Sequence, residues 1–413
     1  MNRNVDELFV YPKQWMDEES MSVAALVRQW ADREIISKRM EYRENYAALF
    51  PEKRGMLCLA IGLQRLTLPV EHGGFGWSGI ANAPGVLTIL CEIGRADAAI
   101  AAIAAVKYAI LATIALDHNL DRKLCEALAP LYAGDDLRTP ALILPGAGMA
   151  GQDSPLFRGR AILAGVHAVH DGYAVSGTNL RPLFGGHMAD LFCVVCADGT
   201  DEPCIAFVPG DAAGVERGPQ ILTTGLNACV NADVSFHDVL IPRENVITGD
   251  AAVEELYVWL NLLLGGVSAG AGTNFFEILS DWGETRVIKG RTVLKENPLC
   301  ASVLADVAEE IALAKLLLYD LAELITRPGE WSNGNHKRVF TFASMIGSRV
   351  QQSVTRAINR GLELMGSAGY AKEWHAEKHW RDVKTIGSLL CGVAAEAPVK
   401  MDTARFFYNC TEI

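Results

Sequence analysis

The spacing of apolar residues divides the chain into three stretches. From about residue 18 to residue 138, apolar residues recur every three or four positions, as in SVAALVRQWADREI and PGVLTILCEIGRADAAIAAIAAVKYAI. That period is typical of helices that bury one face on a core. The turn-rich segment LPVEHGGFGWSG interrupts the pattern. We therefore expect an N-terminal helical domain over residues 18–138, preceded by an irregular arm over residues 1–17.

Residues 139–247 follow a different pattern. Short apolar runs such as ALILPG, DLFCVVCA and PCIAFVPG alternate with Gly, Pro and Asp turns, which is typical of antiparallel strands. The helical spacing returns over residues 248–413, most clearly in NPLCASVLADVAEEIALAKLLLYDLAELI. Between these helices the run RPGEWSNGNH, residues 327–336, predicts a loop. The sequence thus predicts a helical, then a β, then a second helical domain.

Composition narrows the classes of partner. The 413 residues carry a formal net charge of −12, which disfavours nucleic acid or an anionic membrane as the main partner. The apolar stretch AAIAAIAAVKYAILATIAL has Lys107 near its centre, so it predicts a buried helix rather than a membrane span. The first residues lack a signal-peptide core, and the ten cysteines are expected to be reduced thiols in the cytoplasm. Cys193 and Cys196 have no second pair at zinc spacing, so no metal site is predicted.

Six motifs in order resemble those of the acyl-CoA dehydrogenase family, over nearly the whole chain. The resemblance implies an N-terminal α-helical domain, a middle antiparallel β-barrel or sandwich domain and a C-terminal four-helix bundle. It also implies FAD between the β domain and the C-terminal helices, and 2,3-dehydrogenation of an acyl-CoA thioester. A carboxylate would take the α-proton and the flavin a hydride, with an electron-transfer flavoprotein as acceptor. The motifs are LPVEHGGFGWS, ILPGAGMAG, DGYAVSGTNLRPLFGGHMAD, VSFHDVLIPRENVITG, WGETR and MGSAGYAKEWHAEKHWRD.

The usual catalytic glutamate of that family is missing. The resemblance places it about ten residues after the pair Arg381-Asp382, where this chain has Leu390 or, with a one-residue shift, Cys391. A thiol acts as a base only when its pKa is lowered, and no cation flanks Cys391. Some relatives carry the base on the first C-terminal helix, where Glu255 is the nearest acid, although the register set by Arg286 favours Leu260. Glu255 also suits a solvated helix start.

The positions that resemblance assigns to flavin contacts within one subunit are mostly changed. Ile143 stands in place of a threonine, Met149 of a serine, Arg181 of a tryptophan, and Leu183 and Val393 of threonines. Each change removes a hydroxyl donor or an aromatic face, and buried acceptors left without a donor are costly. The half of the flavin site that the chain would use itself is thus expected to be reduced.

The positions assigned to the FAD of a neighbouring subunit are better kept. Arg286 and Gly366 remain, whereas Glu363 stands in place of a glutamine and Lys289 of a phenylalanine. An arginine offers a planar pair of donors to phosphate oxygens.

That asymmetry suggests one subunit of a hetero-oligomeric dehydrogenase, in which a paralogous subunit holds most of the FAD and supplies the base. Two alternatives stay open. The first is a self-sufficient FAD enzyme with a displaced base or altered acyl-CoA chemistry. The second is a structural subunit without a ligand. The helical stretch IALAKLLLYDLAELI suits packing against a paralogue or a second copy.

Overall fold

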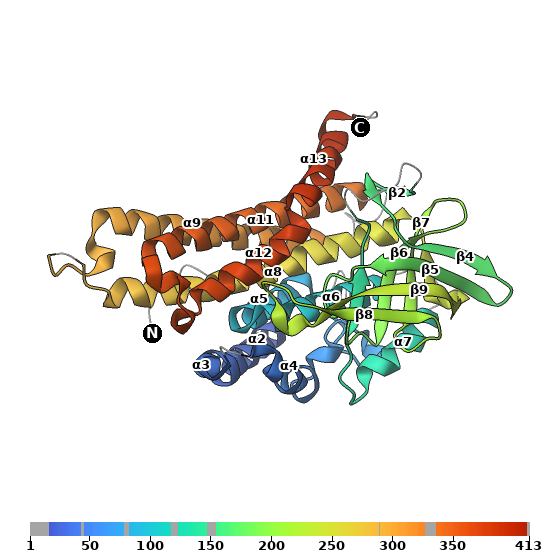
Figure 1. The fold of residues 1–413 in the computed structure, drawn as a ribbon, viewed down its shortest axis with the longest axis horizontal. Helices are drawn as coiled ribbons and strands as arrows, with labels where there is room; N and C mark the ends of the chain where they lie inside the picture. The colour runs from blue at the N-terminus through green and yellow to red at the C-terminus, as the bar shows by residue number, and fades with distance from the viewer. Residues whose placement is uncertain are drawn as a thin grey trace.

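The computed structural model describes residues 16–42, 45–77, 82–116, 123–146, 154–288, 290–326 and 336–410, and its elements follow the predicted order of helices, strands and helices. Residues 327–335 of the predicted loop and most of the N-terminal arm lie outside the described residues, and His336, the last residue of that prediction, begins α11. Figure 1 shows the sheet at one end of the molecule, the N-terminal helices below the centre and the long C-terminal helices extending to the other end.

The N-terminal part is a cluster of helices with capped starts. Asp17 accepts the Ser20 N–H at 2.6 Å to cap α2, and Asp97 accepts the Ala99 and Ile100 N–H groups to cap α6. Helix α6 is buried on all sides from Ala98 to Ile114, as the sequence predicts for this stretch. The principal helices are α2 (Glu18–Trp30), α4 (Tyr46–Gly55), α5 (Ala83–Ala96), α6 (Ala98–Leu116) and α7 (Lys123–Ala133).

The middle part is built on an eight-stranded, mostly antiparallel sheet. Its order is β10-β7-β6-β4-β5-β9-β8, and β1 pairs in parallel with β6. Strand β6 is buried at every position, because Cys193 and Val195 face the core shared with the helices while Val194 and Cys196 face a second core within the β part. The strands are β1 (Pro140–Ile143), β2 (Leu156–Phe157), β3 (Arg160–Ala161), β4 (Gly165–Val169), β5 (Gly172–Leu180), β6 (Leu191–Ala197), β7 (Pro203–Pro209), β8 (Val215–Ile221), β9 (Asn231–Pro242) and β10 (Val246–Thr248).

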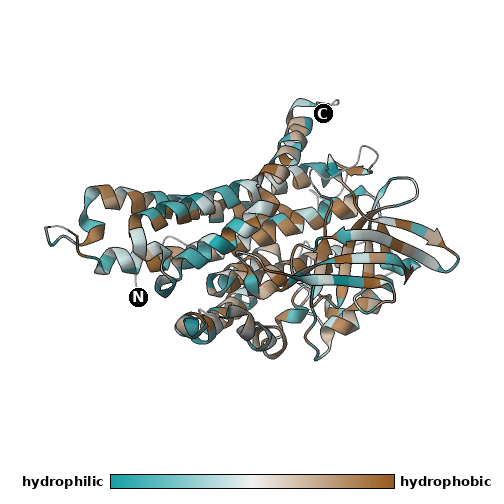
Figure 2. Ribbon diagram, viewed as in Figure 1, coloured by the Kyte–Doolittle hydropathy of each residue, from teal (hydrophilic) through white to brown (hydrophobic). Residues whose placement is uncertain are grey.

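The C-terminal part is a bundle of long helices from which α13 projects alone (Figure 1). Helix α8 is long and apolar enough to cross a bilayer, but 83% of its most apolar window is buried inside the molecule, as in the core helix of a bundle. Along α11 and α12, Figure 2 shows alternating hydrophilic and hydrophobic residues, the pattern of helices with one buried face. The helices are α8 (Asp250–Thr285), α9 (Pro298–Ile325), α11 (His336–Met365), α12 (Ala376–Leu390) and α13 (Val393–Tyr408).

Two glycines allow α5 and α8 to cross in backbone contact. A Cβ atom on Gly94 would lie 2.5 Å from the Val267 carbonyl oxygen, and one on Gly270 would lie closer still to the Cys91 carbonyl oxygen. Any larger residue would push the helices apart. This contact joins the N-terminal helices to the C-terminal bundle.

Candidate functional site

A cavity of about 400 Å³ lies between the β part and the C-terminal helices. We call it the central cavity. The segments that follow β1 and β5 form one wall, and the end of α12 with the start of α13 forms the other. Its volume lies within the range of small-molecule sites. The lining residues are Leu144, Pro145, Gly146, Arg160, Arg181, Pro182, Leu183, Phe184, Thr223, Asn231, Tyr257, Thr385, Ser388, Leu389, Ala394, Ala395 and Pro398.

Most polar side chains that line the central cavity already donate hydrogen bonds within the chain. Arg181 forms a bidentate ion pair with Asp233, with N–O distances of 2.7 and 2.8 Å. The Thr385 hydroxyl donates to the Arg381 carbonyl, and the Ser388 hydroxyl donates to the Thr385 carbonyl. The two hydroxyl donors and two of the five N–H donors of Arg181 are thus already in use.

No aspartate or glutamate occurs among the described residues that line the central cavity. General-base removal of a proton requires a group with a suitable pKa within hydrogen-bond reach of the reacting carbon. The described part of the wall supplies no carboxylate for that role.

A buried ion cluster borders the cavity on the side of α13. Arg160 donates to Asp402 at 3.0 Å, and Arg405 reaches the same carboxylate at 3.2 Å. Arg158 pairs with Glu254, the buried acid at the start of α8. These groups are paired, as the cost of burying a charge requires.

Beyond this cluster lies a second hollow of about 470 Å³, which we call the basic pocket. Its wall carries four cationic side chains and one acidic side chain, so it favours an anionic ligand. Phosphate groups are the natural match for several arginines and a lysine. The lining residues are Arg158, Lys337, Arg338, Thr341, Asp402, Arg405, Phe406 and Asn409.

Glu255, the acid considered on the first C-terminal helix, does not line the central cavity. It is half-buried on α8, two residues before Tyr257, which does line the cavity. Two residues apart on a helix point about 200° away from each other. Leu260, the alternative register, is buried in the helical core.

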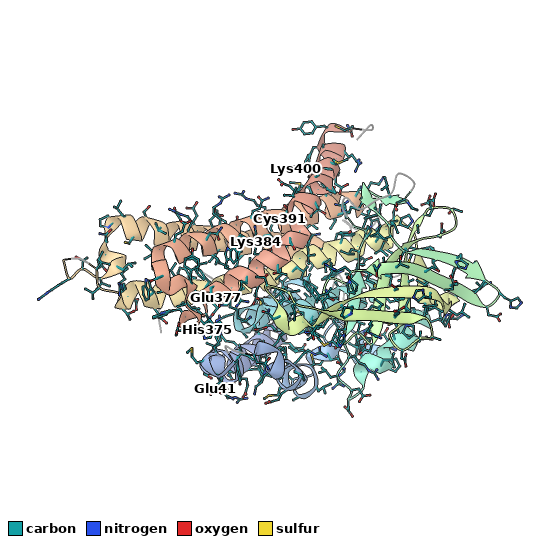
Figure 3. All side chains as sticks on the ribbon, in the orientation of Figure 1. Glu41, His375, Glu377, Lys384, Cys391 and Lys400 are labelled. Atoms are coloured by element: carbon teal, nitrogen blue, oxygen red, sulfur yellow. The ribbon has the colours of Figure 1, made fainter. Side chains whose placement is uncertain are left out.

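Cys391 lies at the junction of α12 and α13, as Figure 3 shows. The cavity is lined by residues on either side of it in the sequence, but Cys391 is not among them. Burial raises the pKa of its thiol, and the nearby charge of Lys384 only partly opposes that shift. A raised thiol pKa gives less thiolate at neutral pH, so the side chain is poorly suited to act as a base.

The residues at the supposed flavin-contact positions within the chain are scattered. Leu183 lines the central cavity, and its N–H donates to the Leu142 carbonyl at 2.8 Å. Ile143 is buried in the second core of the β part, and Val393 is 93% exposed. Met149 lies outside the described residues.

The residues predicted to contact a neighbour's cofactor gather at the far end of the bundle. Arg286 ends α8 and lies over the Trp282 ring, 5.5 Å from its centroid. Trp282 packs edge-on against Trp374, which follows the segment that begins at Gly366. Gly366 has a φ of +61°, a left-handed conformation that favours glycine.

Two further positions belong to this end of the molecule. Glu363, on the last turn of α11, lies 3.5 Å from Arg360 at the surface. Lys289 lies outside the described residues. Beside this end, a hollow of about 690 Å³ runs along the first half of α12, and we call it the α12 hollow. Leu362 and Tyr370, which flank Gly366 in sequence, line it, although Arg286 does not.

The pair Arg381-Asp382 connects three parts of the molecule. Asp382 accepts the Leu226 N–H at 2.7 Å and also pairs with Lys378, which reaches Asp97 at 2.9 Å. We call this group the ion junction. The spacing of Lys378 and Asp382, four apart on a helix, is visible in the sequence, but the third member, Asp97, comes from the distant junction of α5 and α6. Sequence reasoning also missed Tyr257 and Asp402, because nothing local distinguishes them.

The central cavity fits a planar flavin ring by volume but poorly by hydrogen bonding. A flavin carries several acceptors at its edge, and the hydroxyl positions that resemblance assigns to them hold Ile143, Leu183 and Val393. The Thr385 and Ser388 hydroxyls and two of the Arg181 N–H groups already donate within the chain. Acceptors buried without donors lose free energy, so these residues alone do not make a full FAD site.

Comparisons with known proteins agree with this architecture. The family model described as acyl-CoA dehydrogenase, N-terminal domain, matches residues 17–128, and the one described as acyl-CoA dehydrogenase, C-terminal domain, matches residues 258–388. Cyclohex-1-ene-1-carbonyl-CoA dehydrogenase of Geobacter metallireducens is 26% identical over 380 residues, which cover 89% of this chain and 93% of that protein.

Solved structures give the same fold. Butyryl-CoA dehydrogenase from Megasphaera elsdenii superimposes with a TM-score of 0.78 at 16% identity, covering 95% of this chain and 98% of that one. Glutaryl-CoA dehydrogenase from Mycobacterium smegmatis, in complex with FADH2, gives a TM-score of 0.77 at 16% identity and covers 99% of both chains. The predicted fold class, a β domain between two helical domains, is confirmed.

Proposed function

This chain belongs to the acyl-CoA dehydrogenase family, and from that premise we propose that it is one subunit of a hetero-oligomeric acyl-CoA dehydrogenase. A paralogous partner supplies the catalytic base and holds most of the FAD. One observation carries the proposal: the described wall of the central cavity contains no carboxylate, and the nearest candidates, Glu255 and Cys391, lie outside it.

The far end of the bundle supports a contribution to the partner's cofactor. Arg286 is fixed over Trp282, and Gly366 keeps a conformation that favours glycine. The α12 hollow next to this segment has a larger volume than the central cavity. Arg286 is exposed at the end of α8, and an exposed guanidinium suits the phosphates of a dinucleotide. When bound, FAD would supply the hydride acceptor, and Arg286 would hold its phosphate end.

The family and the positive charge of the basic pocket both support an acyl-CoA thioester as the ligand. An acyl-CoA thioester carries phosphates at one end and a carbonyl at the other, and the basic pocket lies beside the central cavity. The proposed electron acceptor is an electron-transfer flavoprotein; an electron transferring flavoprotein of Acidaminococcus fermentans is the subject of one similar structure, with a TM-score of 0.78. All ten cysteines are in the reduced thiol form, which suits the reducing cytoplasm.

A second candidate is a subunit that binds acyl-CoA by itself and carries out altered chemistry on it. The open central cavity favours this candidate, since a purely structural subunit would gain stability by filling that space. The two candidates differ in where the flavin is held.

Measuring flavin content separates them. We expect the full-length chain expressed alone to carry far less than one FAD per chain, and its complex with a paralogous dehydrogenase subunit to carry FAD and oxidise an acyl-CoA. In that complex, Arg286→Ala should lower flavin content several-fold. Arg356→Ala, at an exposed arginine paired with Glu310, is the matched control and should leave flavin content unchanged.

Two other results would each favour one of the alternatives. A lone chain that is fully loaded with FAD and oxidises a thioester unaided would overturn the hetero-oligomer proposal in favour of the self-sufficient enzyme. A chain that contributes to no flavin site, alone or in the complex, would favour the structural subunit.

A further inference from the structure

Tyr257 is the α8 residue that reaches the central cavity. Its ring stacks on Phe157, with centroids 5.7 Å apart and planes 21° apart, and meets Phe340 edge-on at 6.1 Å. The Arg160 guanidinium lies over the same ring at 5.4 Å. Contacts from three sides fix the ring and therefore the direction of its hydroxyl group.

The hydroxyl group is a donor at any physiological pH. Burial raises the pKa of Tyr257 to about 12, so the phenol keeps its proton and cannot act as the missing base. Its neighbours in the wall are engaged elsewhere: Arg160 donates to Asp402 and to the Arg158 carbonyl, and Asn231 donates to the Pro182 carbonyl.

Tyr257 also lies where the two ligand spaces meet. Arg160 lines the central cavity, Asp402 lines the basic pocket, and the two form an ion pair at 3.0 Å. Arg158, also of the basic pocket, lies over the Phe340 ring at 4.8 Å. A ligand with its phosphates in the basic pocket and its acyl group in the central cavity would pass this wall near its carbonyl.

We propose that the Tyr257 hydroxyl donates a hydrogen bond to the thioester carbonyl oxygen of an acyl-CoA bound in the central cavity. This inference rests on the proposed ligand class. Tyr257 is then a ligand-binding residue that orients and polarises the carbonyl, a role assigned here to a side chain of α8.

The test compares two probes on the full-length chain without its partner subunit, so that the partner's own acyl-CoA site does not contribute to the signal. Calorimetry measures the binding of butyryl-CoA, which has the carbonyl, and of free CoA, which lacks it. We expect Tyr257→Phe to weaken butyryl-CoA binding about 5- to 10-fold, the effect of one hydrogen bond, and to leave CoA binding unchanged. Tyr173→Phe, at a tyrosine of β5 outside both pockets, is the matched control and should change neither.

A spectroscopic readout isolates the hydrogen bond from packing. With butyryl-CoA labelled at the carbonyl carbon, the bound C=O stretch should lie at lower frequency in the wild type than in Tyr257→Phe. Equal affinities and equal frequencies in the two proteins would overturn the inference while leaving acyl-CoA as the ligand. If the wild type binds neither probe, the ligand class itself fails, and this inference fails with it.

Discussion

The two halves of α12 carry charge in opposite ways. In the first half, Lys378 and Asp382 are buried and join Asp97 in the ion junction. In the second half, the side chains that face the central cavity are the neutral Thr385 and Ser388. The first half of α12 thus carries buried, paired charges. One to two turns later, the residues of the same helix that face the central cavity carry no charge.

Partners on other elements explain the difference. Burial lowers the pKa of Lys378, but the charges of Asp382 and Asp97 more than offset it, so its pKa is raised. Burial raises the pKa of Asp97, but Lys378 and two backbone N–H groups lower it further than burial raises it. The acid of the Arg-Asp motif therefore serves to hold three parts of the chain together, whereas the cation in the second half of α12, Lys384, is exposed and does not line the central cavity.

The largest expected effect comes from Lys378→Met. Removing the cation leaves two buried carboxylates without a counter-charge, so we expect the free energy of unfolding at pH 7 to fall by about 3–5 kcal/mol. Chemical denaturation measures it. Lys384→Met, at an exposed lysine of the same helix, should change it by less than about 0.5 kcal/mol.

The pH dependence of the stability difference between the wild type and Lys378→Met tests the same ion pairs. Because the folded-state pKa of Asp97 is lowered, its contribution is present above the ordinary value of 3.8 and is lost as the pH falls through the folded value. The difference in free energy of unfolding between the wild type and Lys378→Met should therefore disappear in that acid range. An advantage that persists there would show that packing, rather than ion pairing, stabilises the junction.

Lys107→Met tests whether burial alone accounts for the behaviour of Lys378. Lys107 is buried with its amine 3.3 Å from the Gln64 side-chain oxygen, and burial lowers its pKa. The Gln64 oxygen keeps the Arg138 N–H as a donor. We therefore expect the variant to be more stable than the wild type, by about 1 kcal/mol at pH 7.

The sign follows from proton binding. A lowered folded-state pKa means that the unfolded chain binds the proton more tightly, so wild-type stability rises with pH up to about the ordinary value of 10.5. The gain from Lys107→Met should shrink over that window. A variant less stable than the wild type throughout would mean that Lys107 is paired more strongly than its contacts indicate.

Ser388→Asp tests the second half of α12. This residue is exposed at the cavity wall near the helix end, so a carboxylate there meets water and a weakly unfavourable helix dipole. We expect a loss of about 0.5 kcal/mol in the free energy of unfolding by denaturant titration, with Ser388→Asn as the uncharged control. A loss of several kcal/mol would mean that the cavity is closed to water.

The smallest effect is expected from Cys391→Ser. Because burial raises the thiol pKa above its ordinary 9.0, little thiolate forms at neutral pH. We expect the turnover and flavin content of the hetero-oligomer to stay within about twofold of the wild type. Cys300→Ser, in the first turn of α9, controls for the loss of a thiol. Abolished turnover in Cys391→Ser alone would make this thiol the base.

The sequence predicted the fold well because apolar period and motif order are properties of the chain itself. The buried run around Lys107 and the strand that contains Cys193 and Cys196 both follow from local patterns. At the site, the sequence motif predicted a missing catalytic glutamate, which stays a prediction, but it did not predict which residues form the cavity wall. Tyr257, Arg160 and Asp402 come from three separate stretches, and only packing brings them together. The spacing of Lys378 and Asp382 was visible, but Asp97 lies 281 residues from Lys378.

The glycine contact between α5 and α8 bears on how a ligand enters. With Gly94 and Gly270 placing the two backbones against each other, sliding one helix along the other would drive side chains into main chain. The two helical domains are thereby coupled as one body. A motion that widens the central cavity is left to the β part and to α13, whose first residues line that cavity.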